Sequence, residues 1–570
     1  MTEAGPDPVS PGDGPAPGTP DVTVIIPVYN TMPYLTDCLQ SMVDQTIGAD
    51  RMEVVAVDDG STDGSGEELE RFGTEHPGLF TVIHQENSGG PAGPCNRGLE
   101  VARGRYVFFI GADDYLADYA LERMVDRADA WQSDVVMGRI VGVGGRRGQT
   151  RFTSDEADVP FPHSQLPFAL GNSKMFRRSL LEEHGIRYPL DLRVGSDQPF
   201  TVAAMLHARR ISVLAGDPYY YGLRREDSSN ITFSSGWRTR LEDIGTVMGH
   251  IAELVPPGPD RDQILHRHFT WELANRLRAD FLDLAEGDQR ALTALVRGLA
   301  DEYLTDGVAA KLPVGPRLRL RLAQAGRLEE LRVVVAAERD RLPAPVAVRD
   351  GRVFLALPGY GDHPDEWFES RTENVLGRLT GGVRVTGLAW RGPVLEVEAT
   401  GRSVHPDSAG NVAVEVRALP GTGNVAGAAQ RASQDRTAGK PALRAPVVLE
   451  PDATVPDGST LRVELDLSQL PPPTPRERRR WSARLVLDAG DRSFDLPLVA
   501  DEAVPRDTVT QVRTAAGWFR LLARVGPQRR LVLVRRPVAA EVAPRRERLR
   551  AVLRRFPGRS GARGESPRDV

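Results

Sequence analysis

Two adjacent aspartates follow an apolar run in the first half of the chain. Residues 106–110 read YVFFI, and Asp113 and Asp114 come shortly after, separated from the run by Gly111 and one alanine. The run predicts a buried strand that ends just before the carboxylates. Carboxylate oxygens are hard ligands that suit Mg²⁺ or Mn²⁺ beside an anionic group such as a diphosphate. The alternative is a strand-to-loop turn without chemistry.

Other polar side chains occupy the same position relative to other apolar runs. Asn30, Asp58, Asp59 and Asn87 each follow a short apolar segment, and helical patterns separate these segments. This alternation over residues 21–236 predicts an α/β domain with a mostly parallel, Rossmann-like sheet. Because ligands bind beyond the carboxyl ends of the strands in such sheets, we expect these side chains to share one site.

Five motifs together give the domain a recognisable pattern. They are VTVIIPVYN, VDDGSTD, NSGGPAGPCNRGL, FIGADDYL and VGSDQPF. In order and spacing they resemble the inverting family 2 glycosyltransferases, which have the nucleotide-sugar-binding GT-A fold, over roughly residues 21 to 232. The segments NSGGP, SDQPFT, RISVL and YYYGLRRE, with helices and a β-sandwich after them, are also similar to the poly(ribitol-phosphate) β-N-acetylglucosaminyltransferases of wall teichoic acid decoration.

The resemblance implies a set of residues that bind the UDP-sugar donor. Tyr29 would stack on the uracil, Asp58 and Asp59 would accept hydrogen bonds from the base, and the glycine-containing turn at Gly89 would let the backbone approach the nucleotide. Each segment taken alone is equally compatible with an ordinary tight turn. The expected donor-binding residues are Pro27, Tyr29, Asn30, Asp58, Asp59, Asn87, Gly89, Asn96, Asp113, Lys174 and Arg225.

The resemblance also assigns the chemical roles. Asp113 would hold the divalent cation, Mn²⁺ or Mg²⁺, and Asp197 would be the base that takes the proton from the acceptor hydroxyl. Asp197 precedes the helical run PFTVAAML, so a helix N-cap without chemistry is the alternative. For Lys174 and Arg225, expected near the acceptor and the diphosphate, the alternative is a surface salt bridge.

Three positions depart from the family pattern. Gly111 stands where the first acid of Asp-x-Asp is usual, Cys95 where an arginine usually precedes asparagine, and Ser196 where an acid often precedes the base. These departures favour a non-catalytic polymer-binding protein as one alternative. Retention of both Asp113 and Asp197 favours an enzyme. Cys95 has no histidine motif with it, which disfavours a nucleophilic cysteine.

The rest of the chain predicts separate regions. Helical periodicity covers residues 237–342, and alternation in twos over residues 343–537 predicts an antiparallel, Ig-like β-sandwich with a hairpin turn at Asp350. We expect residues 1–20 to be a disordered leader. The basic tail, residues 538–570, is either a solvated segment or a short amphipathic helix on an anionic membrane surface.

Composition limits the classes of partner and compartment. The net charge of −6 disfavours nucleic-acid binding. Two cysteines without metal or redox spacing fit a reducing compartment, and no apolar run reaches the length of a membrane span. We therefore expect a cytoplasmic protein, with the inner face of the plasma membrane as a further option.

The combined expectation is an inverting glycosyltransferase. It would transfer a sugar, N-acetylglucosamine from UDP-GlcNAc, to hydroxyls of a phosphate-containing cell-envelope polymer such as poly(ribitol phosphate). A capsule, exopolysaccharide or glycolipid transferase with a lipid-linked acceptor is the alternative within the same fold. The sandwich would bind polymer or assemble a homo-oligomer.

Overall fold

The computed structural model describes most of the chain. The described residues are 19–146, 148, 151–225, 236–342, 344–371, 375, 379, 383–401, 403–419, 441–451, 459–471, 479–514 and 517–537. The chain divides into two compact units, residues 1–312 with 319–328, and residues 313–318 with 329–570. Nearly all of the expected leader and the whole basic tail lie outside the described residues.

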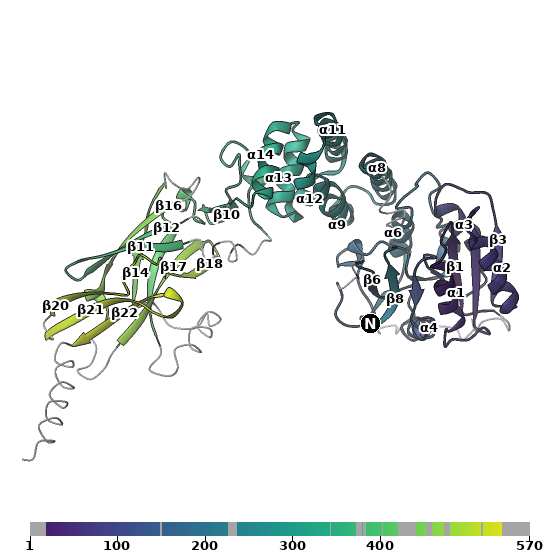
Figure 1. Cartoon of the computed structure of the whole chain (residues 1–570), viewed down its shortest axis with the longest axis horizontal. Helices are drawn as coiled ribbons and strands as arrows, with labels where there is room; N and C mark the ends of the chain where they lie inside the picture. Colours follow the sequence, from purple (N-terminus) through teal and green to yellow (C-terminus); the bar gives the residue numbers. More distant parts are fainter. Residues whose placement is uncertain are drawn as a thin grey trace, which may run out of the picture. The chain divides into compact units, whose positions relative to one another are not determined.

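The first unit is built on one mixed eight-stranded sheet (Figure 1). The strand order is β3-β2-β1-β4-β7-β6-β8-β5, and the pairs β1–β2, β1–β4, β2–β3 and β6–β8 are parallel. This confirms the expected Rossmann-like α/β fold, with β7 and β5 as antiparallel additions. The strands are β1 Val22–Val28, β2 Met52–Asp58, β3 Phe80–His84, β4 Tyr106–Phe109, β5 Tyr115–Leu116, β6 Val135–Val143, β7 Met175–Arg177 and β8 Ile211–Leu223.

Helices cover both faces of this sheet, so the central strands are apolar on both sides. Val24 and Ile26 of β1 pack in one core with α1, α2 and α4, whereas Ile25 points into a second core with α3, α5 and α6. Continuous apolar runs, as in β1, are expected of strands buried on two faces. The helices are α1 Leu35–Val43, α2 Ser65–Glu75, α3 Ala92–Val101, α4 Ala120–Trp131, α5 Arg178–Glu183 and α6 Asp197–His207.

A helical region follows the sheet domain. Its helix α9 continues into a π-helical turn, η2, which is followed by the short helix α10 and a 3-10 turn, η3. No helix among the described residues is long and apolar enough to cross a membrane. The elements are α8 Trp237–Leu254, α9 Pro259–His268, η2 Phe269–Leu273, α10 Ala274–Arg276, η3 Ala279–Asp283, α11 Glu286–Tyr303, α12 Asp306–Lys311, α13 Val314–Gln324 and α14 Leu328–Arg339.

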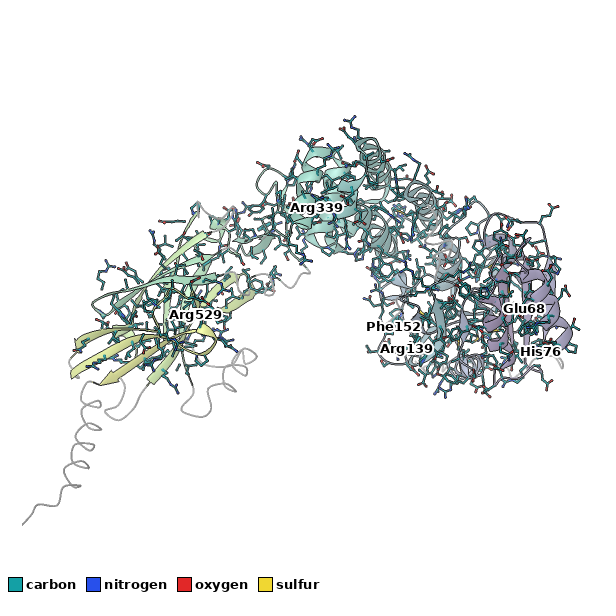
Figure 2. All side chains as sticks on the ribbon, in the orientation of Figure 1. Glu68, His76, Arg139, Phe152, Arg339 and Arg529 are labelled. Atoms are coloured by element: carbon teal, nitrogen blue, oxygen red, sulfur yellow. The ribbon has the colours of Figure 1, made fainter. Side chains whose placement is uncertain are left out.

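The second unit contains the expected antiparallel β-sandwich; Arg529, labelled in Figure 2, belongs to it. A five-stranded and a seven-stranded sheet share one apolar core. The predicted hairpin is confirmed as β9–β10, with Asp350 and Gly351 at φ of 51° and 72°, the left-handed backbone of a type I′ turn. The strands are β9 Val346–Arg349, β10 Arg352–Leu355, β11 Val383–Arg391, β12 Val394–Gly401, β13 Val412–Ala418, β14 Leu443–Pro446, β15 Val448–Pro451, β16 Ser459–Asp466, β17 Arg479–Ala489, β18 Arg492–Pro497, β19 Val499–Ala500, β20 Asp507–Thr514, β21 Gly517–Val525 and β22 Leu531–Pro537.

Helix α3 approaches β1 closely at Gly98, where a Cβ atom would lie 2.5 Å from the Cγ2 of the fully buried Ile25. We expect Gly98→Ala to lower the free energy of unfolding by about 1–3 kcal/mol, because the core has no room for the methyl group. Gly298→Ala is the control, since Gly298 lies in α11 with open space around it; alanine there should stabilise by up to about 1 kcal/mol. Urea unfolding measures both, and equal effects would contradict the close contact.

Candidate functional site

Asp58 and Asp59 lie buried at the carboxyl end of β2, as predicted. Asp58 accepts a hydrogen bond from the Ser61 amide at 3.0 Å and lies 2.9 Å from His84 Nδ1. Burial by itself would raise the pKa of Asp58, but the bonds from Ser61 and His84 outweigh it and lower the pKa. Asp59 accepts hydrogen bonds from the amide and hydroxyl of Ser88, at 3.1 and 3.0 Å. The two carboxylates therefore brace the loops around them.

The loop after β1 leaves an aromatic ring open to solvent. The side chain of Tyr29 is 52% exposed, among the most exposed large hydrophobic residues described. Asn30 has a left-handed backbone, with φ of 48°, and its Oδ1 accepts a hydrogen bond from the Thr62 amide at 2.8 Å. Pro27 pairs with Val57 in the parallel ladder of β1 and β2. An exposed ring on a braced loop suits stacking on a planar base.

Asn87 and Gly89 form a turn that faces open space. Asn87 donates to the Asp59 carbonyl at 3.0 Å and accepts from the Gly89 amide at 3.0 Å. Gly89 has φ of 88°, and no atom lies within 4 Å of the place where its Cβ would be. A ligand can thus approach this backbone closely, as predicted for the glycine-containing segment.

Asn96 holds another segment in place. Its side chain donates to the carbonyl of Tyr188 and accepts from the amide of Tyr188, both at 2.9 Å. In this structure the amide of Asn96 therefore ties α3 to the segment that leads to Asp197. Cys95, beside it, is buried, and burial raises the pKa of its thiol far from the range of a thiolate nucleophile.

Asp113 lies in the tight turn after β4, where the Asp114 amide bonds the Gly111 carbonyl at 2.9 Å. Its carboxylate accepts a hydrogen bond from Arg225 Nε at 2.9 Å, and the two side chains are only 14% and 15% exposed. Arg225 also reaches the Asn30 carbonyl, at 3.4 Å. The structure thus brings together three residues that the sequence places far apart, and Arg225 is not in a surface salt bridge.

Asp114 is an internal carboxylate. It accepts hydrogen bonds from the Tyr220 hydroxyl at 2.5 Å, the Leu223 amide at 2.7 Å and Arg146 Nη1 at 3.0 Å. Burial raises the pKa of Asp114 to about 6, against the lowering effect of Arg146. A Cβ on Gly111 would lie 3.2 Å from an oxygen of each of Asp113 and Asp114. An acid at position 111 would therefore crowd two other carboxylates, which explains why glycine suits this position.

The residues present could hold a hard divalent cation if the phosphate groups of the substrate supply most of its ligands. Asp113 offers one carboxylate, and no group of three or more His, Cys, Asp or Glu side chains that could hold a metal ion occurs within the described part of the chain. Mg²⁺ commonly binds through one or two carboxylates together with substrate phosphates. Asp113 would therefore hold such an ion jointly with a diphosphate.

Asp197 is the first residue of α6, with Ser196 at the N-cap and no side-chain capping bond. The alternative that Asp197 is the N-cap is therefore wrong. Burial raises the pKa of Asp197, while the nearby positive charges of Arg267 and Lys174 lower it and leave a net upward shift. A carboxylate with a pKa moved toward neutrality suits a general base.

Lys174 is almost completely buried, with 1% of its surface exposed, so it makes no surface salt bridge. Its ammonium group donates to the carbonyl of Gly171. Burial lowers the pKa of Lys174 to about 7, and the charge of Asp197 opposes this shift. The Tyr220 hydroxyl, which donates to Asp114, also accepts a hydrogen bond from the Gly111 amide at 3.3 Å. This hydroxyl therefore holds the turn that carries Asp113 against β8.

Sequence reasoning missed Arg267. This residue comes from α9 in the helical region, and its Nη1 donates to the Gln198 Oε1 at 2.6 Å. His268 Nε2 lies 2.9 Å from the same oxygen. The π-helical turn η2 begins at the next residue, and such turns are frequent at functional sites. In the sequence Arg267 stands between His266 and His268, which matches no motif, so only the fold reveals this contact.

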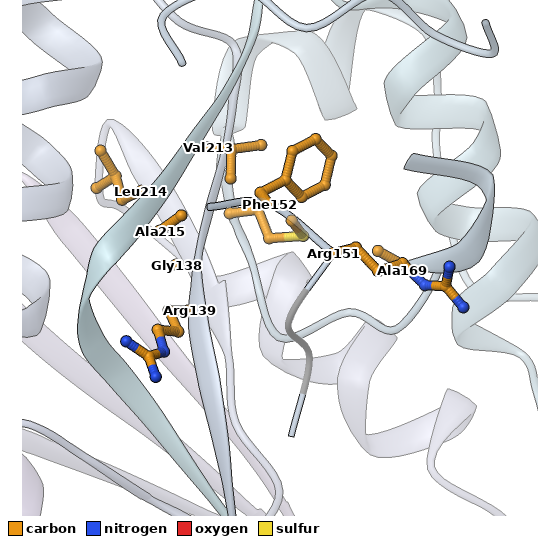
Figure 3. A pocket seen from close by; sticks show the side chains of 9 residues that line it. Gly138, Arg139, Arg151, Phe152, Ala169, Val213, Leu214 and Ala215 are labelled. Atoms are coloured by element: carbon orange, nitrogen blue, oxygen red, sulfur yellow. The ribbon is translucent and has the colours of Figure 1, made fainter. Parts of the chain in front are cut away.

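A small cavity in the same unit lies apart from these residues. It has about 20 Å³, room for about one water molecule, and lies between β6, β8 and Phe152. In Figure 3 the side chains of Arg139 and Arg151 extend to opposite sides, away from Phe152. None of the predicted site residues lines it.

Two family models match the chain. Residues 23–185 match glycosyl transferase family 2, and residues 241–335 match the glycosyl transferase TarS linker domain. The chain carries a family 2 glycosyltransferase domain. The TarS linker match covers the helices that supply Arg267 and His268 to Gln198.

Two curated proteins are similar to part of this chain. The poly(ribitol-phosphate) beta-glucosyltransferase of Bacillus spizizenii is 36% identical over 206 residues, which are 36% of this chain and 32% of that protein. TarS of Staphylococcus aureus, a poly(ribitol-phosphate) beta-N-acetylglucosaminyltransferase, is 35% identical over 262 residues, 44% of this chain and 45% of that protein. The match thus spans less than half the length of each of these two relatives.

The solved structures of TarS share the fold. TarS 1-349 in complex with UDP-GlcNAc matches with a TM-score of 0.52 at 28% identity, over 59% of this chain and 96% of that chain. A longer TarS structure matches 91% of this chain and 85% of that chain, with a TM-score of 0.54 at 21% identity. The second match shows a shared fold beyond the glycosyltransferase domain.

The buried Lys174 gives a pH dependence of stability. Because its pKa falls from the ordinary 10.5 to about 7 in the folded chain, the unfolded chain binds one more proton between pH 7 and 10. The free energy of unfolding should therefore rise with pH across this window, and below it the full cost of holding a charged amine in the core is present and no longer changes with pH. Lys174→Met should remove this rise, whereas Lys311→Met should keep it. Urea unfolding at pH 7, 8, 9 and 10 measures the slopes, and an unchanged slope in Lys174→Met would refute the burial effect.

Proposed function

We propose that this protein transfers a sugar from a UDP-sugar to a hydroxyl group of a phosphate-containing cell-envelope polymer, with inversion at the anomeric carbon. One observation supports this most strongly: a carboxylate with a raised pKa, Asp197, lies at the start of α6 beside Lys174 and Arg267. The relatives that act on poly(ribitol phosphate) support the choice of acceptor class.

In the proposed reaction Asp197 acts on the acceptor. It takes the proton from the attacking hydroxyl as the new glycosidic bond forms and the bond to the diphosphate breaks. Arg267 and Lys174 favour the ionised form of Asp197, because their charges oppose the rise in pKa that burial causes. The proton thus moves to a carboxylate oxygen while the sugar moves to the acceptor oxygen.

The donor would be held at the carboxyl ends of β1, β2 and β4. Tyr29 would stack on the base, and the backbone at Gly89 would admit the nucleotide. Asp113 would hold a divalent cation, Mn²⁺ or Mg²⁺, which when bound neutralises charge on the diphosphate leaving group. Arg225, now on Asp113, can bind phosphate oxygens with its planar guanidinium group.

The donor sugar is proposed as N-acetylglucosamine. The TarS structure that resembles this chain over 59% of its length is a complex with UDP-GlcNAc. The Bacillus relative is named a beta-glucosyltransferase, so UDP-glucose is the second candidate donor. Pocket contacts with the substituent at C2 of the sugar would distinguish the two.

The test is sugar transfer by the purified chain. UDP-GlcNAc and UDP-glucose would be offered with poly(ribitol phosphate) and Mn²⁺ or Mg²⁺, and the products identified by mass spectrometry. We expect Asp197→Asn to lower transfer at least 100-fold, because the amide cannot accept the proton. Asp113→Asn should lower it by a similar factor. Asp217→Asn, which changes an exposed acid paired with Arg123, is the matched control and should retain full activity. Transfer by Asp197→Asn at the wild-type rate would exclude Asp197 as the base.

The helical region should tune the same reaction through Arg267. Because the charge of Arg267 lowers the pKa of Asp197, Arg267→Gln should move the acidic limb of the pH profile of kcat/KM to higher pH. Arg267→Lys, which keeps the charge, should restore part of the profile. Arg276→Gln, in α10 of the same region, is the control. An unshifted limb in Arg267→Gln, with normal folding by circular dichroism, would contradict this role.

A further inference from the structure

The β-sandwich contains a cavity of about 290 Å³ that none of the assigned residues lines. Its rim carries Arg384, Arg530 and Gln528, and its apolar wall includes Leu496, Pro497 and Val499. The cavity is large enough for a phosphorylated polyol or a single sugar ring. It belongs wholly to the second compact unit, so it is separate from the site around Asp113 and Asp197.

The two arginines face the same side of the sheet. Arg384 of β11 is the direct neighbour of Val499 in the parallel pairing with β19, and Arg530 bridges to Val499 from the other side. Directly opposed residues point to the same face, and adjacent strands lie about 4.8 Å apart. The Cα atoms of the two arginines are therefore about 10 Å apart, with Val499 between them.

Neither guanidinium group has a hydrogen bond or an ion pair within the described part of the chain. Other arginines of the sandwich differ in this respect. Arg391 pairs with Glu464 at 2.5 Å, and Arg462 pairs with Glu398 at 3.2 Å. Two positive charges at this spacing on one face repel each other, and an anion placed between them would gain attraction from both.

The rim next to Arg530 is held in a fixed conformation. Gln528 and Arg529 are consecutive left-handed residues, with φ of 54° and 55°. Non-glycine residues adopt this backbone only where the surroundings impose it. Arg529 supplies that constraint, because its side chain donates to the carbonyls of Ala500 at 2.9 Å and Val504 at 3.4 Å, and also to that of Asp501. The rim is therefore arranged before any ligand binds.

We propose that this cavity is a second ligand site, which binds a phosphate group borne on a polyol. Arg384 and Arg530 would each donate hydrogen bonds to phosphate oxygens, since guanidinium groups match this geometry. The aliphatic face of the polyol would pack on Val499 and Pro497, with Gln528 beside its hydroxyls. The identity of the ligand as polymeric acceptor rests on the proposed function. The site would then hold one repeat of the polymer while another repeat is glycosylated.

The test measures binding of the full chain to poly(ribitol phosphate) by biolayer interferometry, without UDP-sugar or metal. The variant Arg384→Gln/Arg530→Gln should bind at least tenfold more weakly than wild type. The matched control is Arg391→Gln/Arg462→Gln, which removes the same charge from the same sandwich and should change binding less than twofold. Arg384→Lys/Arg530→Lys keeps both charges but lacks the planar guanidinium groups, and it should lose an intermediate amount of polymer affinity.

Competition between small molecules and the polymer identifies the chemical group that the site recognises. sn-Glycerol 3-phosphate should displace the polymer, inorganic phosphate should displace it less well, and glycerol should not displace it. Displacement by inorganic phosphate as effective as that by sn-glycerol 3-phosphate would overturn the polyol contact. The proposed site would be contradicted if the wild type and both glutamine variants bound the polymer equally well. It would also be contradicted if both glutamine variants lost polymer binding to the same extent.

The outcome is independent of the transfer assay. If the chain transfers no sugar and the binding difference remains, the proposed function fails and the site stands. If it transfers sugar while all variants bind polymer equally, the site fails and the proposed function stands. Melting temperatures of the variants show whether each is folded.

Discussion

The burial of carboxylates at one edge of the sheet is the constraint on which the rest of the site depends. Asp114 and Asp197 are both removed from most of the solvent, and burial raises the pKa of each. A buried acid is tolerated only where donors or cations surround it. The chain meets this requirement with groups from distant segments: Arg146 and Tyr220 reach Asp114, while Lys174 and Arg267 lie near Asp197.

This requirement explains how the parts of the first unit act together. Tyr220 of β8 donates to Asp114 and accepts a hydrogen bond from the Gly111 amide, so one hydroxyl fixes the turn after β4 to β8. Gln198 receives Arg267 from the helical region. The helices that match the TarS linker domain therefore contribute to the site itself. A simple spacer between the glycosyltransferase domain and the sandwich would have no need of a buried arginine.

The structure explains how the fold accommodates the three departures from the family pattern, Gly111, Cys95 and Ser196. Gly111 leaves room for the oxygens of Asp113 and Asp114, and Cys95 packs in the core with an unreactive thiol. Ser196 sits at the N-cap of α6 without a capping side-chain bond, and Arg267 supplies a charge near Asp197 from elsewhere. These accounts favour an enzyme over a decayed transferase, because each changed position is accommodated around an intact Asp113 and Asp197.

The sequence by itself determined the elements and the edge of the sheet where the chemistry lies. Apolar runs of strand length, helical periods between them and polar residues at the strand ends are local patterns, so Asp58, Asp59 and Asp113 could be placed without coordinates. The hairpin turn at Asp350 was predictable for the same reason.

Only the tertiary structure decided which charged side chains contact each other. Arg225 lies 112 residues from Asp113 in sequence, and Arg267 lies 69 from Gln198. Contacts of this kind depend on how strands and helices pack, and no local pattern encodes them. The same holds for Arg384 and Arg530, which come onto one face of the sheet only because both residues pair with Val499.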